Sequence, residues 1–156
     1  YKIKEDYIHK ELIKYFPKIE FRRDNVICGG ISKRRPDWLI HLYHYAIIIE
    51  CDEYQHRNNS CENKRMVEIY QDLCNNDSVI REVPVIFIRF NPDDYTDKDG
   101  VNHKSCFIID PKDNKLKPTN NINIRIKELI KIVNKSINNG IPTKAITIKY
   151  LFYNGH

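Results

Sequence analysis

The chain has 156 residues, of which 41% are hydrophobic and 30% charged, a length and composition that fit one folded domain. No run approaches the ~18 apolar residues that a membrane-spanning helix needs, and no signal-peptide pattern opens the chain. Lysine and arginine number 26 against 21 acidic residues, so the formal charge of +5 suits a polyanionic partner without requiring one. These features argue against insertion into a membrane and against secretion. Because the chain begins at Tyr1 rather than at a methionine, we interpret it as part of a larger polypeptide.

The five cysteines favour an intracellular protein with reduced thiols. Their number is odd and no close CxxC pair occurs, whereas a secreted disulfide framework normally has an even number. The alternative is a structural zinc site, for which the candidate ligands are Cys51, His56, Cys61 and Cys74. Their spacing matches no common zinc finger.

The first half of the chain predicts one helix followed by strands. Apolar residues recur at helical spacing over residues 4–16, and Pro17 ends this helix. Residues 19–27 form a strand or an irregular extended piece, which Gly29 and Gly30 stop. Two strands follow in close succession, at 36–42 and 45–52. The second contains three consecutive isoleucines (Ile47, Ile48 and Ile49), which indicates burial on both faces of a sheet.

The second half continues the alternation of helices and strands. Ser60 is a candidate N-cap for a helix through Cys74, and a buried strand is expected over residues 84–90. An exposed hairpin tip at 97–100 precedes a strand at 105–109. A third helix spans 122–137, and a late strand spans 145–153. The predicted fold class is α/β, with a central mixed β-sheet flanked by helices.

The segment from Arg34 to His56 carries the most chemical information. If its two strands form a hairpin centred between Tyr43 and His44, Asp37 lies directly opposite Glu50, with Cβ atoms ~4.5–5.5 Å apart. The side-chain period of two places Asp52 on the same face as Glu50, while Cys51 points away. Three carboxylates would then converge at the end of a buried strand, where a divalent cation would relieve their repulsion. Alternatively, Asp37 caps a turn and the later acids simply begin a solvated loop.

Two features surround this acidic point. His56 follows the strand end and could serve as a general base near neutral pH, although a surface-loop histidine is the simpler interpretation. His41 and His44 are not expected to share a ligand, because residues three apart on a strand point to opposite faces. Basic residues lie on both sides, the pattern of acids for a metal and arginines for phosphate that a nuclease needs. They are Arg22, Arg23, Lys33, Arg34, Arg35, Arg57, Lys64, Arg65, Arg81 and Arg89.

These residues resemble the PD-(D/E)XK nuclease core. The pattern reads PD at Pro36-Asp37, E-x-D at Glu50 and Asp52, and H at His56, which is similar to the very-short-patch-repair endonucleases and other E-x-D-x-x-x-H proteins. The segments CENKRM (61–66) and FIRFNPDDY (87–95) are similar to nuclease-like domains of giant DNA viruses. The resemblance implies a single restriction-endonuclease-like domain over residues 1–156, with a core at about 1–95 and a C-terminal extension at 96–156. It implies a location in the cytoplasm, the nucleus or a viral factory.

The function that the resemblance implies is a metal-dependent DNA endonuclease, with a place in repair, homing or restriction. Asp37, Glu50 and Asp52 would bind Mg²⁺, for which Mn²⁺ could substitute, and His56 would be the base. Glu5 would be the acid of the first helix, in preference to Glu11. Four arginines would contact DNA phosphates, namely Arg34, Arg35, Arg57 and Arg65.

One departure from the family pattern bears on the mechanism. Asp52 stands where the commoner motif has a lysine, so a lysine-based mechanism is in doubt. The alternatives to an enzyme are a non-catalytic DNA-binding module with a nuclease fold and a zinc-stabilised structural domain.

Overall fold

The computed structural model describes residues 2–56, 59–75 and 81–156, with only the backbone of His56 and Asn59. Helices are α1 (Ile3–Tyr15), α2 (Asn59–Cys74) and α3 (Asn121–Asn138), with a short 3₁₀ turn η1 (Glu53–His56). Strands are β1 (Arg22–Arg23), β2 (Trp38–Leu42), β3 (Tyr45–Cys51), β4 (Val85–Phe90), β5 (Tyr95–Thr96), β6 (Asn102–His103), β7 (Phe107–Asp110), β8 (Lys115–Pro118) and β9 (Ile146–Leu151).

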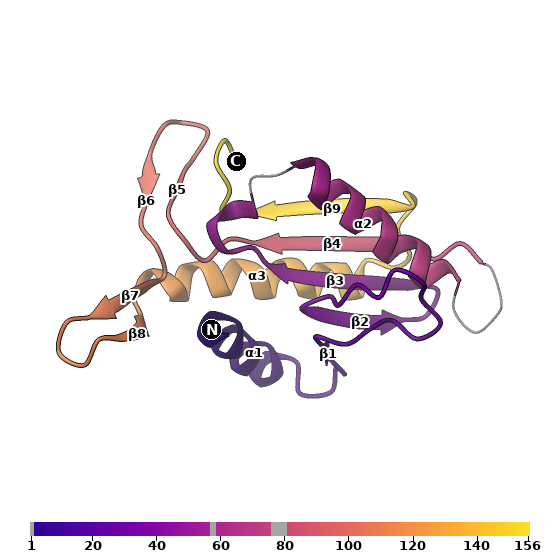
Figure 1. Ribbon diagram of the computed structural model, residues 1–156, viewed down its shortest axis with the longest axis horizontal. Coiled ribbons are helices and arrows are strands. Elements are labelled where there is room, and N and C mark those ends of the chain that lie inside the picture. The colour runs from indigo at the N-terminus through magenta and orange to yellow at the C-terminus, as the bar shows by residue number, and fades with distance from the viewer. Residues whose placement is uncertain (1, 57–58, 76–80) are drawn as a thin grey trace.

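Five strands form a mixed sheet in the order β1-β2-β3-β4-β9. β1 and β3 each pair antiparallel with β2, whereas β3–β4 and β4–β9 are parallel pairs. The α/β class with a mixed central sheet is therefore confirmed. The C-terminal strand β9 is an integral part of this sheet, at the edge opposite β1 (Figure 1).

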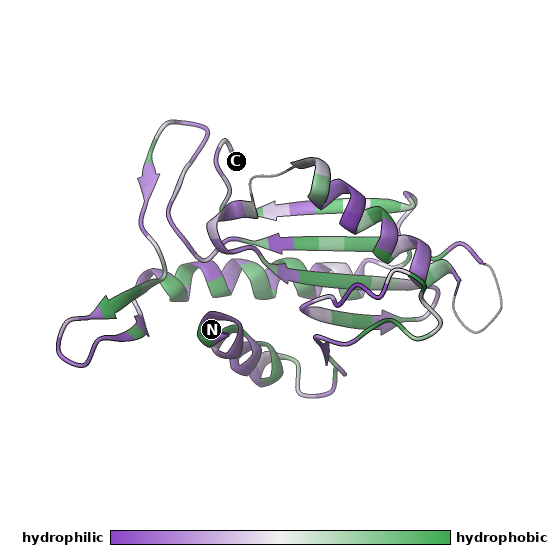
Figure 2. Cartoon of the chain, in the orientation of Figure 1, coloured by the Kyte–Doolittle hydropathy of each residue, from purple (hydrophilic) through white to green (hydrophobic). Residues whose placement is uncertain are grey.

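Helices cover both faces of the sheet. α1 and α3 pack on the face that carries Trp38, Ile47 and Ile49, while α2 packs on the face of Leu39 and Ile48. The central strands β2, β3 and β4 are largely hydrophobic, and the two short hairpins β5–β6 and β7–β8 extend away from one end of the sheet (Figures 1 and 2). All three isoleucines at 47–49 have 0% exposure, as the predicted burial on both faces requires.

Several predicted boundaries change. α2 already includes Asn59, so Ser60 is not its N-cap but a residue within the helix. The extended segment at 19–27 is reduced to the two-residue strand β1, and strand β8 was not expected. The other predicted helices and strands are confirmed, because their apolar periodicity is strong.

Among the described residues, no helix combines the length and the apolar run that crossing a membrane requires.

Candidate metal and nucleic-acid site

The hairpin of β2 and β3 has the register that the sequence predicts. Trp38 lies opposite Ile49 and Leu42 opposite Tyr45, so Tyr43 and His44 form the turn. The turn forms without an Asn-Gly pair because His44 adopts a left-handed conformation with φ 68°. Continued by one step, this register brings Asp37 opposite Glu50.

Asp37 and Glu50 contact one another at the end of the hairpin. The Asp37 backbone N–H donates to Glu50 Oε2 (3.2 Å), and the Cys51 N–H donates to Asp37 Oδ2 (2.8 Å). Burial and the neighbouring charge of Glu50 raise the pKa of Asp37 to about 8, and burial also raises the pKa of Glu50.

A cation from α2 covers Glu50. Arg65 Nε and Nη2 both donate to Glu50 Oε1, at 3.2 Å and 3.0 Å, and Nη2 also donates to the carbonyl of Arg35 (2.9 Å). The side chain of Glu50 is only 5% exposed, so this guanidinium provides much of the charge compensation that a buried carboxylate requires. Arg65, predicted to contact phosphate, is thus bound to one of the predicted metal ligands.

Asp52 has a different environment from the one expected. Arg89 Nε and Nη2 donate to its two oxygens at 2.6 Å and 3.0 Å, and the hydroxyl of Tyr153 donates a short hydrogen bond to Oδ2. Arg89 Nη2 also binds Glu62 of α2 at 2.6 Å. Although burial opposes its charge, these bonds raise the pKa of Arg89 above its ordinary value. Arg89 of β4 thus pairs with Asp52, the third carboxylate that the sequence places at the cation, and the role of Asp52 as a metal ligand stays a prediction.

The carboxylate pair opens into a cavity of about 510 Å³. Its walls include Glu5 of α1, Arg34 of the loop before β2 and Tyr54 of turn η1. Burial and the charge of Asp37 raise the pKa of Glu5, which lies 3.8 Å from Arg23. Glu11 is not among the described residues that line the cavity. Glu5 thus lines the cavity, and its assignment as the acid of the first helix stays a prediction.

Turn η1, which precedes α2, is strained and tightly held. Tyr54 and Gln55 both have left-handed backbones, with φ 57° and 60°, an arrangement that costs energy in residues other than glycine. The Tyr54 N–H donates to Asp93 Oδ2 (2.7 Å), and Lys4 Nζ of α1 binds Asp93 Oδ1 (2.7 Å). The turn ends at His56, the expected base, whose side chain, like Arg57, lies outside the described residues.

The loop before β2 is anchored by an acid that sequence reasoning missed. Asp72 of α2 accepts hydrogen bonds from the backbone N–H groups of Ile31 (2.9 Å) and Ser32 (3.1 Å). Gly30 packs so closely that a Cβ there would lie 2.7 Å from the Asp72 carboxyl carbon. Gly29-Gly30 was a signal of this close approach, but nothing in the sequence identified Asp72 as its partner. The anchor fixes the loop that carries Arg34 and Arg35.

The proposed zinc ligands do not assemble. Cys61 and Cys74 lie at opposite ends of α2, thirteen residues and therefore ~20 Å apart. Cys51 packs in the core on the other face of the sheet, and none of the five cysteines, all of which lie among the described residues, forms a disulfide. Within the described ranges, no three histidine, cysteine or acidic side chains form a ready metal-binding group. The zinc-stabilised domain is therefore not supported.

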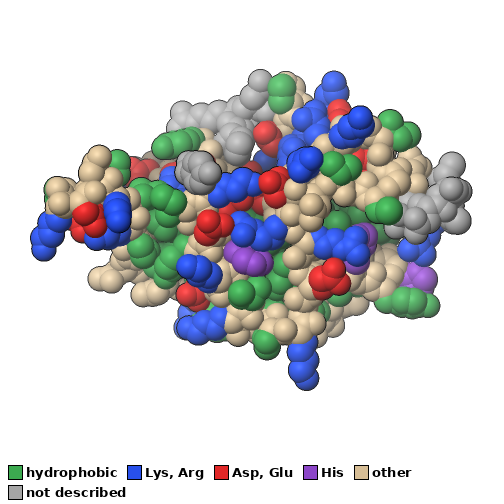
Figure 3. Space-filling view, turned by 60° about the horizontal axis from the view of Figure 1, so that its bottom comes forward, with side chains coloured by type: hydrophobic (Ala, Val, Ile, Leu, Met, Phe, Trp, Pro, Cys, Tyr) green, Lys and Arg blue, Asp and Glu red, His purple; other side chains and the backbone are tan. Residues whose placement is uncertain are grey.

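The surface charge around α1 and β1 is mixed. Lysine and arginine side chains alternate with acidic ones across this face, without one uniformly basic patch (Figure 3). Contacts with a polyanion would thus depend on individual arginines rather than on the modest net charge.

The chain was compared with protein-family models, with curated proteins and with solved structures. None of the three comparisons found a match.

Proposed function

We propose that this protein is a Mg²⁺-dependent DNA endonuclease with a restriction-endonuclease-like fold. The observation that carries the proposal is the pair of carboxyl groups, Asp37 and Glu50, at the wall of a cavity that Arg34 and Arg65 also line. A mixed sheet with helices on both faces is compatible with that fold.

The donor chemistry of the pair fits a divalent cation. Two carboxyl groups this close repel one another when both are ionised, and a divalent cation would relieve that repulsion. Mg²⁺ in nucleases and related enzymes commonly takes one or two carboxylates and completes its shell with waters and substrate phosphate. Asp37 and Glu50 would therefore be its ligands, without Asp52. When bound, Mg²⁺ would polarise the phosphate as a Lewis acid.

The remaining residues have roles that their positions favour. Arg34 lines the cavity with its side chain 40% exposed and would neutralise a phosphate oxygen. Glu5 of α1 also lines the cavity and would serve as the helical acid that the resemblance implies. His56 would accept the proton of the attacking water from the end of turn η1, which leads directly from the strand that carries Glu50.

A non-catalytic DNA-binding module is the second candidate. The ion pair between Arg65 and Glu50 favours it, because this guanidinium already compensates the buried carboxylate without a metal ion. Such a protein would bind DNA equally well with and without Mg²⁺ and would leave it uncut.

The deciding experiment is incubation of supercoiled plasmid with the wild-type chain in Mg²⁺ and in EDTA. A nuclease will convert the plasmid to nicked or linear forms in Mg²⁺ or Mn²⁺ only. Asp37→Asn should abolish cleavage and leave DNA binding unchanged or stronger, because a negative charge facing phosphate is gone. Glu11→Gln, which removes a charge on α1 outside the cavity, is the matched control and should cut normally. Binding without cleavage by the wild type would establish the second candidate instead.

A further inference from the structure

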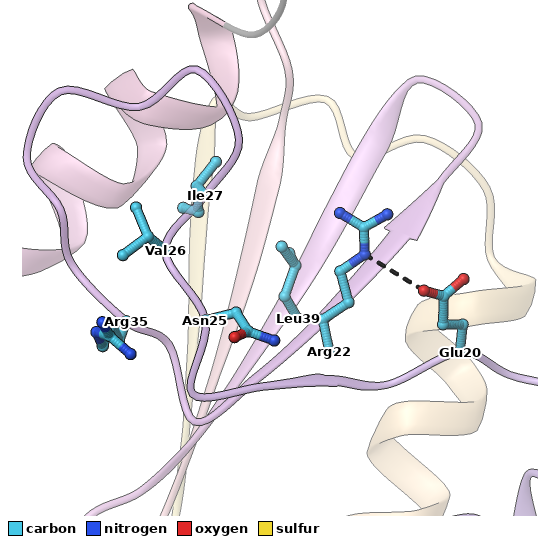
Figure 4. A pocket seen from close by; sticks show the side chains of 7 residues that line it. All are labelled: Glu20, Arg22, Asn25, Val26, Ile27, Arg35 and Leu39. Atoms are coloured by element: carbon cyan, nitrogen blue, oxygen red, sulfur yellow. Dashed lines mark hydrogen bonds and ion pairs between the residues drawn. The ribbon is translucent and has the colours of Figure 1, made fainter.

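A second hollow lies beside the carboxylate cavity, at the β1 edge of the sheet. Its volume is about 610 Å³. Arg22 of β1 and Arg35 of the loop before β2 stand on two sides of it, with Asn25 between them and Leu39 of β2 behind (Figure 4). We call it the edge groove.

Asp37 of the carboxylate cavity and Leu39 of the edge groove lie on the same face of the sheet. Leu39 follows Asp37 by two residues, so their side chains point to the same side and are ~6.5–7 Å apart along the strand. Arg22 lies directly opposite Leu39 in the β1–β2 pair and extends over that same face. Adjacent loop residues serve the two hollows, since Arg34 lines the cavity and Arg35 lines the groove.

The walls of the edge groove are held in place by the backbone. The Asp24 N–H donates to the carbonyls of Pro36 (3.0 Å) and Asp37 (3.3 Å), which joins the two ends of the loop. Arg35 Nη1 donates to the Asp24 carbonyl at 3.2 Å. The groove therefore has a fixed shape relative to Asp37, and a ligand would not have to order it.

The chemistry of the edge groove suits a phosphodiester backbone. Two guanidinium groups offer forked donors that match phosphate oxygens, and the Asn25 amide adds a donor and an acceptor. Among the described residues that line the groove, the one carboxylate is that of Glu20, which is 80% exposed and holds Arg22 through a long contact of 3.4 Å. Such a surface pair contributes little and yields readily to a stronger anion.

We infer that the edge groove binds the DNA strand next to the phosphate at Asp37 and Glu50. The inference rests on the proposed function for the reactive phosphate. In this arrangement Arg34 would contact that phosphate, while Arg22 and Arg35 contact its neighbours along the same strand. Arg22 and Asn25 thereby join the DNA-binding residues, and Glu20 competes with DNA for Arg22.

The test is fluorescence anisotropy with a short labelled DNA duplex, titrated with salt in an Asp37→Asn background that does not cut. Arg22→Gln and Arg35→Gln should each weaken binding and lower the log–log salt slope by about 0.9, the value for one lost phosphate contact. Glu20→Gln should strengthen binding. Lys131→Gln, which removes an exposed charge on α3 on the opposite face of the sheet, is the matched control and should change neither quantity.

Equal effects of Arg22→Gln and Lys131→Gln, or weaker binding by Glu20→Gln, would overturn the inference. Thermal unfolding of each variant distinguishes a lost contact from a lost fold. The plasmid assay separates this inference from the proposed function. A wild-type chain that binds DNA through Arg22 without cutting it refutes the nuclease and leaves the edge groove as a DNA-binding site.

Discussion

Glu50 and Asp52 stand two residues apart at the end of β3, and both are nearly buried, with 4% and 2% exposure. Their counter-charges differ. Both oxygens of Asp52 accept bonds from the buried Arg89, and Tyr153 adds a third bond. Glu50 instead lies beside Asp37, whose backbone N–H donates to it, and it pairs with the partly exposed Arg65. Removing one partner of a buried, fully paired carboxylate destabilises the fold, whereas an underpaired carboxyl pair beside a cavity can take a cation.

Replacing Asp52 and replacing Asp37 with asparagine should have different effects on the free energy of unfolding. Asp52→Asn should lower the free energy of unfolding by about 3–5 kcal/mol, because Arg89 loses its main buried partner. Asp37→Asn should leave that free energy unchanged or raise it near neutral pH. Urea unfolding measures both, and the double variant Asp52→Leu with Arg89→Met should recover part of the loss. If Asp52→Asn proved as stable as the wild type but lost metal binding, Asp52 would be a ligand after all.

His56→Ala should lower the rate of DNA cleavage by about 10²–10⁴-fold, the usual contribution of a general base, with little change in DNA affinity. Single-turnover cleavage and anisotropy with the same duplex measure the two quantities. Gln55→Ala, which removes the neighbouring side chain in turn η1, shows how much of the loss comes from disturbing the turn. An alanine variant at position 56 that cuts near the wild-type rate would make His56 an ordinary loop residue.

The raised pKa of Asp37 predicts that stability in EDTA depends on pH. With a pKa of about 8 in the folded chain against 3.8 as the ordinary value, the folded state holds the extra proton between these limits. The free energy of unfolding should therefore fall as the pH rises from about 4 to 8, by up to ~1.4 kcal/mol per unit. Asp37→Asn removes this contribution, so its unfolding free energy should vary less over the same range. Parallel curves for the two proteins would show that Asp37 titrates normally.

Arg65 and a metal ion should compete for Glu50 Oε1. The resulting change in metal affinity is the smallest effect that we predict. Arg65→Gln should bind Mn²⁺ up to about fivefold more tightly in the absence of DNA, since a partly exposed ion pair is worth about 1 kcal/mol or less. Isothermal titration calorimetry measures the affinity. Lys64→Gln removes a neighbouring exposed charge on α2 and serves as the control. Weaker Mn²⁺ binding by Arg65→Gln would mean that Arg65 orients Glu50 for the metal.

Local sequence patterns determined much of this molecule. The alternation of side chains in the two strands around Tyr43-His44 fixes which face each residue occupies, and a short turn leaves one register that keeps the isoleucines buried. The approach of Asp37 to Glu50 follows from that register alone. The apolar spacing of the helices is equally local, so α1, α2 and α3 could be predicted within a few residues.

Only the tertiary structure decided the partner of Asp52. Arg89 belongs to β4, which pairs in parallel with β3 after a crossover that contains α2. Tyr153 lies 101 residues after Asp52 in the chain. Two further contacts join elements that are far apart in the sequence. Lys4 pairs with Asp93, and Asp72 binds the loop that follows Gly29 and Gly30. A sequence motif gives only the spacing of its own residues. The strand order and the helix packing decide which oppositely charged side chains lie next to them. Those counter-charges separate a buried anchor such as Asp52 from a carboxylate such as Glu50 that a cation could bind.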